Sequence, residues 1–161
     1  MSITEDMICF SLYSAARATA QAYRRLLAPW SLTYPQYLVL AVLWTEGDQT
    51  IGSLGEAMQL DSGTLSPLVR RLERDGLVTR TRDADDERVV RVRLTDAGTA
   101  LRAELAPIHK KVAEIAGVGD RQHRELIAEL REITARLPAG LRQRELLFAS
   151  LPVAQFCENP A

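Results

Sequence analysis

Cys9, Tyr13 and Tyr23 are spaced so that a single helix would carry all three on one side. A helix advances by about 100° per residue, so Tyr13 lies about 40° from Cys9 in one direction and Tyr23 about 40° in the other. Tyrosine hydroxyls can donate hydrogen bonds that favour a thiolate, and the dipole at a helix start has the same effect. The spacing therefore allows a reactive thiol, although a small buried cysteine among packing tyrosines is the commoner arrangement.

A second set of polar side chains lies on one face of a helix predicted over residues 62–75. Turning the apolar stripe of Leu65, Leu68, Val69 and Leu72 inward leaves small residues exposed at the start of this helix and arginines toward its end. Small residues permit close approach to base edges, and arginines bind guanine edges or phosphates. A solvated charged face is the alternative. The candidate DNA-binding residues on this helix are Ser62, Thr64, Ser66, Pro67, Arg70, Arg71 and Arg74.

The elements around this face have the order of a winged helix-turn-helix. Thr50 is suited to cap a short helix through Met58, and Asp61 or Ser62 to cap the next helix after a turn at 59–60. After Gly76, two short runs at 77–82 and 88–94 are rich in valine, threonine and arginine, and they flank a mostly acidic loop. The sequence therefore predicts a mainly α fold with a small β wing.

Further helices are expected on both sides of this unit, and their bounds follow from apolar spacing and from proline and glycine. We expect them over residues 4–27, 34–44, 95–116 with a kink at Pro107, 121–137 ending before Pro138 and Gly140, and 141–151.

Composition limits the class of protein. The chain has 161 residues and a formal net charge of −1, but eight arginines stand against six acidic residues from Arg70 to Arg93, so the predicted DNA-binding stretch is basic. No apolar run approaches the ~18 residues of a membrane span, and Glu5 and Asp6 stand where a signal peptide carries positive charge. We therefore expect a cytoplasmic protein. We expect no cofactor and no metal, since His109 and His123 do not have the spacing of metal ligands.

Over about residues 5–137 the sequence resembles the MarR family of winged-helix regulators. The resemblance rests on the run from Ser62 to Val78, on Asp-Asp-Glu-Arg at 85–88 and on Leu-Thr-Asp-Ala-Gly at 94–98. It implies a homodimer on double-stranded operator DNA, with Arg88 in the minor groove and held by Asp86. It also implies four segments: an N-terminal dimerisation helix (1–33), the DNA-binding domain (34–98), C-terminal dimerisation helices (99–137) and a C-terminal extension (138–161).

The N-terminal half resembles the organic-hydroperoxide-sensing (OhrR-type) subfamily, through the segments at 9–14, 32–37 and 60–65. This resemblance implies that Cys9 is the peroxide sensor, that Tyr13 and Tyr23 hydrogen-bond it, and that Tyr34 reaches it from the partner subunit. The oxidised cysteine would then release the DNA. In some members a small thiol completes the reaction, and in others a second cysteine does. Cys157 is either such a resolving thiol or an incidental exposed cysteine.

Three other functions stay open at this point. A MarR-type regulator can respond to a small aromatic ligand, with Cys9 structural. A thiol peroxidase would need a second activating cluster, which the sequence lacks, so we do not expect an enzyme. A winged helix can also serve as an interaction module without DNA, but the arginine-bearing helix face argues against this.

Overall fold

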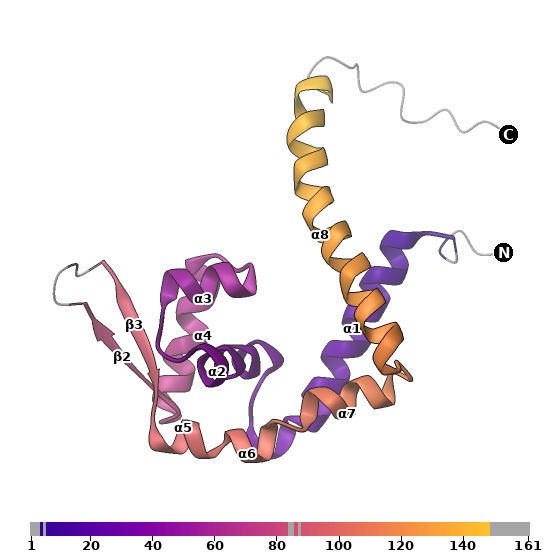
Figure 1. Cartoon of the computed structure of the whole chain (residues 1–161). Coiled ribbons are helices and arrows are strands. Elements are labelled where there is room, and N and C mark those ends of the chain that lie inside the picture. Colours follow the sequence, from indigo (N-terminus) through magenta and orange to yellow (C-terminus); the bar gives the residue numbers. More distant parts are fainter. Residues whose placement is uncertain (1–3, 5, 84–85, 87, 149–161) are drawn as a thin grey trace, which may run out of the picture. The chain divides into compact units, whose positions relative to one another are not determined.

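The computed structural model describes residues 4, 6–83, 86 and 88–148, with the backbone alone at 120 and 138–148. The chain divides into two units, Met1–Val112 and Ala113–Ala161. Within the part described, no helix is both long enough and apolar enough to cross a membrane. In chain order the elements (Figure 1) are α1 (Ile8–Leu26), η1 (Ala28–Trp30), α2 (Tyr34–Glu46), β1 (Gln49–Thr50), α3 (Ile51–Met58), α4 (Ser62–Arg74), β2 (Val78–Arg82), β3 (Val90–Leu94), α5 (Asp96–Ala100), α6 (Arg102–Leu105), α7 (Ile108–Ile115) and α8 (Asp120–Phe148).

The predicted helix-turn-helix is confirmed as α3 and α4. Thr50 caps α3, since its hydroxyl accepts a hydrogen bond from the Ser53 amide at 3.0 Å. Gln59 ends α3 in the left-handed region, with φ 54°. Of the two caps considered for α4, Asp61 is the one used: its carboxylate accepts a hydrogen bond from the Thr64 amide at 2.8 Å.

The predicted wing is also confirmed, as an antiparallel sheet of three strands in the order β1-β3-β2. β2 pairs with β3 from Val78 opposite Leu94 to Arg82 opposite Val90. The two-residue strand β1 adds to the other edge of β3 and was not predicted, because two residues are too short to display a strand period. The sheet therefore connects the start of α3 directly to the wing.

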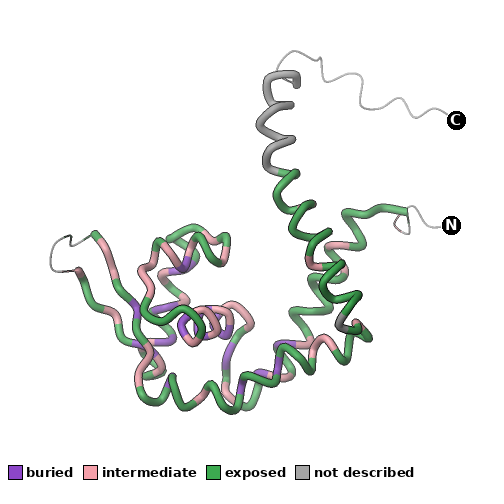
Figure 2. Tube along the Cα trace, viewed as in Figure 1, coloured by how far each residue is buried: buried purple, intermediate pink, exposed green. Residues whose placement is uncertain are grey.

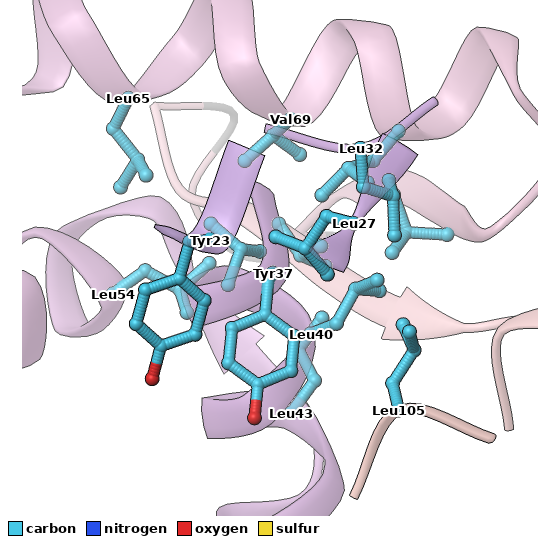
Figure 3. Close-up of a cluster of buried hydrophobic side chains, with 14 of the residues drawn as sticks. Tyr23, Leu27, Leu32, Tyr37, Leu40, Leu43, Leu54, Leu65, Val69 and Leu105 are labelled. Atoms are coloured by element: carbon cyan, nitrogen blue, oxygen red, sulfur yellow. The ribbon is translucent and has the colours of Figure 1, made fainter. Parts of the chain in front are cut away.

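One apolar core holds the helix-turn-helix and the sheet together (Figures 2 and 3). Leu54 of α3 is fully buried, as are Leu65, Val69 and Leu72 of α4, which confirms the inward stripe. Val78 and Val92 bring the two wing strands into the same cluster. Each such side chain contributes about 1.5–3 kcal/mol on burial, so this packing fixes the face that α4 exposes.

A cluster of hydrogen bonds where β3 meets α5 explains the run Leu-Thr-Asp-Ala-Gly at 94–98. The Thr95 hydroxyl donates to the Gly76 carbonyl at 2.6 Å and accepts from the Gly98 amide at 3.0 Å. A Cβ at Gly98 would collide with the Leu77 carbonyl oxygen. The Trp44 indole N–H donates to the Gly98 carbonyl at 2.8 Å. The start of α5 is thereby fixed to both α2 and the wing.

The bounds predicted for the helices after Thr95 were wrong. The single helix over 95–116 is instead α5, α6 and α7, with Leu101 at the first junction and Pro107, which lacks an amide hydrogen, at the second. The helix predicted to end before Pro138 continues to Phe148 as α8. Residues 141–148 of the expected helix 141–151 therefore belong to α8. A proline or a glycine inside a helix costs about 3 or about 1 kcal/mol, which the strong helix formers on both sides can offset.

Candidate DNA interface and thiol site

Six of the seven candidate DNA-binding residues on α4 are exposed. Ser62, Thr64 and Pro67 are exposed along its first half, and Ser66 is half-buried. The Thr64 hydroxyl also donates to the second carboxylate oxygen of Asp61 at 2.9 Å, so the cap and this candidate contact are one unit. The arginines Arg70, Arg71 and Arg74 follow on the exposed second half.

Ion pairs divide the eight arginines between Arg70 and Arg93 into two groups. Four pair with carboxylates: Arg74 with Asp75 (3.5 Å), Arg80 with Glu73 (2.7 Å), Arg91 with Asp83 (2.7 Å) and Arg93 with Asp48 (2.6 Å). Among the described residues, the other four have no carboxylate partner: Arg70, Arg71, Arg82 and Arg88.

Arg82 is therefore a candidate DNA contact that the sequence reasoning missed. It is exposed at the end of β2, whereas the residues predicted to contact DNA lie on α4 and in the loop of the wing. The strand alternation at 78–82 was the available signal, because it places Arg80 and Arg82 on the same side of β2.

The wing loop presents Arg88 through a turn built on Asp86. The Asp86 carboxylate accepts a hydrogen bond from the Arg88 main-chain amide at 2.9 Å, and its carbonyl accepts one from the Val89 amide at 2.9 Å. The contact shown is thus to the Arg88 backbone. Support of the Arg88 guanidinium by Asp86 stays a prediction, and residues 84, 85 and 87 lie outside the described residues.

Cys9 lies in the first turn of α1, which begins at Ile8, and its side chain is exposed. Large apolar neighbours share this exposure: Ile8 is 63% exposed, Phe10 44% and Tyr13 57%. The Tyr13 ring carries the Arg17 guanidinium 5.5 Å from its centroid. In the described part of one protomer, no hydrogen-bond partner of the Cys9 sulfur is present.

Tyr23 and Tyr34, two of the predicted supporting tyrosines, are brought together. Their rings stack with centroids 4.0 Å apart, and Tyr37 lies 5.7 Å from Tyr23. Figure 3 shows the hydroxyls of Tyr23 and Tyr37 pointing the same way. In the described part of the chain, no hydrogen bond or ring contact connects this cluster to Cys9 or Tyr13. The role of Tyr34 toward a partner subunit stays a prediction, and Cys157 lies outside the described residues.

The tyrosine cluster keeps its protons well above neutral pH. Burial first, and then the neighbouring Tyr34 and Tyr37, raise the pKa of Tyr23 to about 12. Burial also raises the pKa of Tyr34 above its ordinary value. Both hydroxyls therefore stay protonated to a higher pH than a free tyrosine, and at neutral pH they can donate a hydrogen bond to an anion such as a thiolate, as an unshifted tyrosine also can.

Comparison with known proteins gives a family match and relatives along most of the chain. The model of the MarR family matches residues 32–90. The chain is 42% identical over 142 residues to the HTH-type transcriptional regulator TtmR of Methylorubrum extorquens, covering 88% of this chain and 73% of that one. It is 42% identical over 104 residues to the organic hydroperoxide resistance transcriptional regulator of Bacillus subtilis, covering 65% and 71%.

Among solved structures, the chain is similar to AbfR of Staphylococcus epidermidis. Reduced AbfR bound to DNA and overoxidized AbfR bound to DNA are each 35% identical to it, with a TM-score of 0.69 over 81% of this chain and 91% of AbfR. The disulfide-formed AbfR is 32% identical, with a TM-score of 0.59 over 84% and 90%. These similarities concern a winged-helix protein solved on DNA and in several oxidation states.

Proposed function

Since the chain belongs to the MarR family of DNA-binding transcription regulators, we propose that it is a homodimeric repressor that binds operator DNA when reduced and releases it when an organic hydroperoxide oxidises Cys9. On this proposal the protein acts in the cytoplasm, where its operator DNA is. The observation that carries the proposal is an exposed cysteine in the first turn of α1, one helical turn before the exposed Tyr13.

The DNA-binding half rests on α4 and the wing. Two such recognition helices in a symmetric dimer bind half-sites about one DNA turn apart, which predicts an inverted-repeat operator. In this arrangement Ser62, Thr64, Ser66 and Pro67 approach base edges, and the arginines follow. Arg88 reaches the minor groove, with Asp86 shaping its turn.

Dimerisation would bury apolar surface that is exposed in a single chain. On α1 this surface surrounds Cys9, and on α8 Leu126, Leu130 and Leu137 recur at helical spacing and are 41%, 38% and 59% exposed. Exposed apolar patches of this kind are typical of protein interfaces. Since Cys9 has no sulfur partner in the described protomer, its hydroxyl donors on this proposal come with the second copy, including the partner's Tyr34.

The oxidation step involves only the thiol and the peroxide. The Cys9 thiolate attacks one peroxide oxygen, the O–O bond breaks, and the alcohol leaves with a proton. Sulfur is oxidised to a sulfenic acid and the peroxide is reduced. A second thiol then displaces hydroxide, which leaves as water, and a disulfide forms. That thiol is a small cellular thiol or Cys157.

The disulfide is the form in which we expect DNA release. AbfR was solved on DNA both reduced and overoxidized, and separately with a disulfide formed. If this chain behaves likewise, an oxyacid at Cys9 is small enough to be tolerated, whereas a bulky disulfide would displace α1 and the dimer helices.

The proposal is tested with the Cys9→Ser variant. A duplex selected from a random pool by the reduced wild type serves as operator, and its binding is followed by fluorescence anisotropy. We expect cumene hydroperoxide with a small thiol to release the wild type and to leave Cys9→Ser bound. Release that survives the serine substitution would contradict the sensor role.

A separate experiment assigns the second thiol. Non-reducing electrophoresis after peroxide treatment would reveal a cross-linked dimer that disappears in Cys157→Ala if Cys157 resolves the sulfenic acid. Absence of the cross-link, or its persistence in Cys157→Ala, would leave the small thiol as the resolving partner.

A cavity favours one alternative, a regulator that responds to a small aromatic ligand. It has a volume of about 180 Å³ and is lined by Tyr37, Trp44, Arg102 and His109 among others, so aromatic rings, a guanidinium and an imidazole face it. Ligand pockets usually measure about 300–1,000 Å³, so this one is small for such a ligand. Release of DNA from Cys9→Ser by a phenolic acid would favour this function over the redox switch.

A further inference from the structure

A basic groove lies between α4 and the wing. It has a volume of about 330 Å³ and is lined by Ser66 and Arg70 of α4, by Arg80, Thr81 and Arg82 of β2, by Val90 of β3 and by Ile51 at the start of α3. Three of these seven residues are arginines, and none is acidic.

The arginines of the groove have different surroundings. Arg80 is held by Glu73, which accepts from the Arg80 main-chain amide at 3.2 Å and from its guanidinium at 2.8 and 2.7 Å. Both guanidinium nitrogens contact the same oxygen, Glu73 Oε2, while Oε1 accepts from the main-chain amide, so Glu73 fixes Arg80 along the groove wall and compensates its charge. Arg70 and Arg82 have no carboxylate partner in the described part of the chain. The groove therefore presents two uncompensated cations, one from the helix and one from the strand.

The position of the groove determines which anion can reach it. When a recognition helix occupies the major groove and a wing the adjacent minor groove, the sugar-phosphate strand that separates the two grooves must pass between helix and wing. Here that space is the arginine-lined groove between α4 and β2. A phosphate there would meet Arg70 on one side and Arg82 on the other.

We propose that this groove binds a backbone phosphate of the operator, with Arg70 and Arg82 as its cationic ligands and Arg80 as a residue positioned by Glu73. The inference rests on the DNA-binding part of the proposed function and is independent of the redox part. A phosphate contact carries no sequence information, so the groove sets the depth and orientation of α4 and the wing rather than base preference.

Arg82→Gln is the sharpest test, because the residue is exposed and pairs with no described carboxylate, so the change leaves the fold intact. Binding is measured from low to high salt on the selected duplex and on a scrambled duplex of equal composition. We expect roughly tenfold weaker binding on both duplexes, since a phosphate contact is lost in each protomer. The slope of log affinity against log salt should fall by about 0.9 per phosphate, or about 1.8 per dimer.

Two controls separate a specific contact from a change in total charge. Arg82→Lys retains a cation and should restore most of the salt slope. Arg121→Gln removes an exposed arginine on α8 and should leave both affinity and slope unchanged.

An unchanged slope in Arg82→Gln, with the wild type still binding its selected duplex, would overturn the inference and leave the proposed function standing. Weakening confined to the selected duplex would also overturn it, because that result indicates base readout. Failure of the wild type to select any duplex would instead overturn the proposed function.

Discussion

At the scale of single residues, the account depends on hydroxyl groups that stay protonated. Tyr23 and Tyr34 stack in one cluster, and a phenolate there would lose its hydration. Their raised pKa values extend protonation to a higher pH than that of a free tyrosine, which is already a donor at physiological pH.

The Tyr23 pKa predicts how stability depends on alkaline pH. A pKa raised from 10.0 to about 12 in the folded state means that the folded chain binds the proton more tightly than the unfolded chain. The stabilising contribution is therefore fully present below pH 10 and is lost as the pH rises to about 12. Urea unfolding at a series of pH values should show this decline, and Tyr23→Phe should make it shallower. An identical decline in the variant would contradict the assignment.

Sequence reasoning located the tyrosines but not their environments. Helical spacing placed Cys9, Tyr13 and Tyr23 on one side of α1, yet Tyr13 is exposed and Tyr23 is buried. The difference arises because only the second half of α1 packs on the core, and helical spacing does not report which turns are covered by other elements. The stacking of Tyr34 on Tyr23 depends on how α2 crosses α1, which spacing within one helix does not determine.

At the scale of elements, the start of α4 depends on one carboxylate. The Thr64 amide and hydroxyl donate to Asp61 and lower its pKa below the ordinary value. The stabilisation is present at neutral pH and is lost as the pH falls through the lowered pKa. We expect Asp61→Ala to lower the melting temperature and weaken DNA binding, while Asp61→Asn, which retains a capping oxygen, changes both less. Equal losses in the two variants would contradict a capping role.

Gly98 at the start of α5 has no room for a side chain. A Cβ there would collide with the Leu77 carbonyl oxygen and approach Leu94 within 3.2 Å. We expect Gly98→Ala to cost about 1–3 kcal/mol in urea unfolding, the usual range for overpacking. Gly52→Ala is the matched control: its Cβ would lie 3.7 Å from the nearest atom, within a helix, and should be neutral or slightly stabilising. A Gly98 variant as stable as this control would be inconsistent with the structure.

Most elements of the DNA-binding unit could be predicted, because each carries its own signal. Thr50 and Asp61 are capping residues, and the valine and arginine alternation marks β2 and β3. β1 and the continuation of α8 past Pro138 could not be predicted in the same way. β1 exists only through its pairing with β3, and α8 passes Pro138 against the usual rule.

At the scale of the whole molecule, the proposed dimer predicts that exposed leucines on α8 become buried. Leu130→Glu would place a charge in that interface once per protomer and would lose the burial of the 38% of Leu130 that is still exposed, about 0.6–1.1 kcal/mol for each copy. Sedimentation should show a shift from dimer to monomer for this variant. Ala128→Glu adds the same charge to the exposed opposite side of α8 and should sediment like the wild type. A Leu130→Glu variant that remains fully dimeric would exclude this face from the interface.

The central claim is that the oxidation state of Cys9 controls DNA binding, and one titration tests it most directly. Reduced protein on its selected duplex is treated with increasing cumene hydroperoxide and a small thiol, and each sample is divided between anisotropy and mass spectrometry of the Cys9 peptide. We expect the fraction of released DNA to rise in proportion to the fraction of Cys9 in a disulfide and to reach completion at about one oxidant per chain. A dithiol reductant should reverse the release. Full binding with Cys9 fully converted to disulfide, or release with Cys9 still reduced, would contradict the central claim.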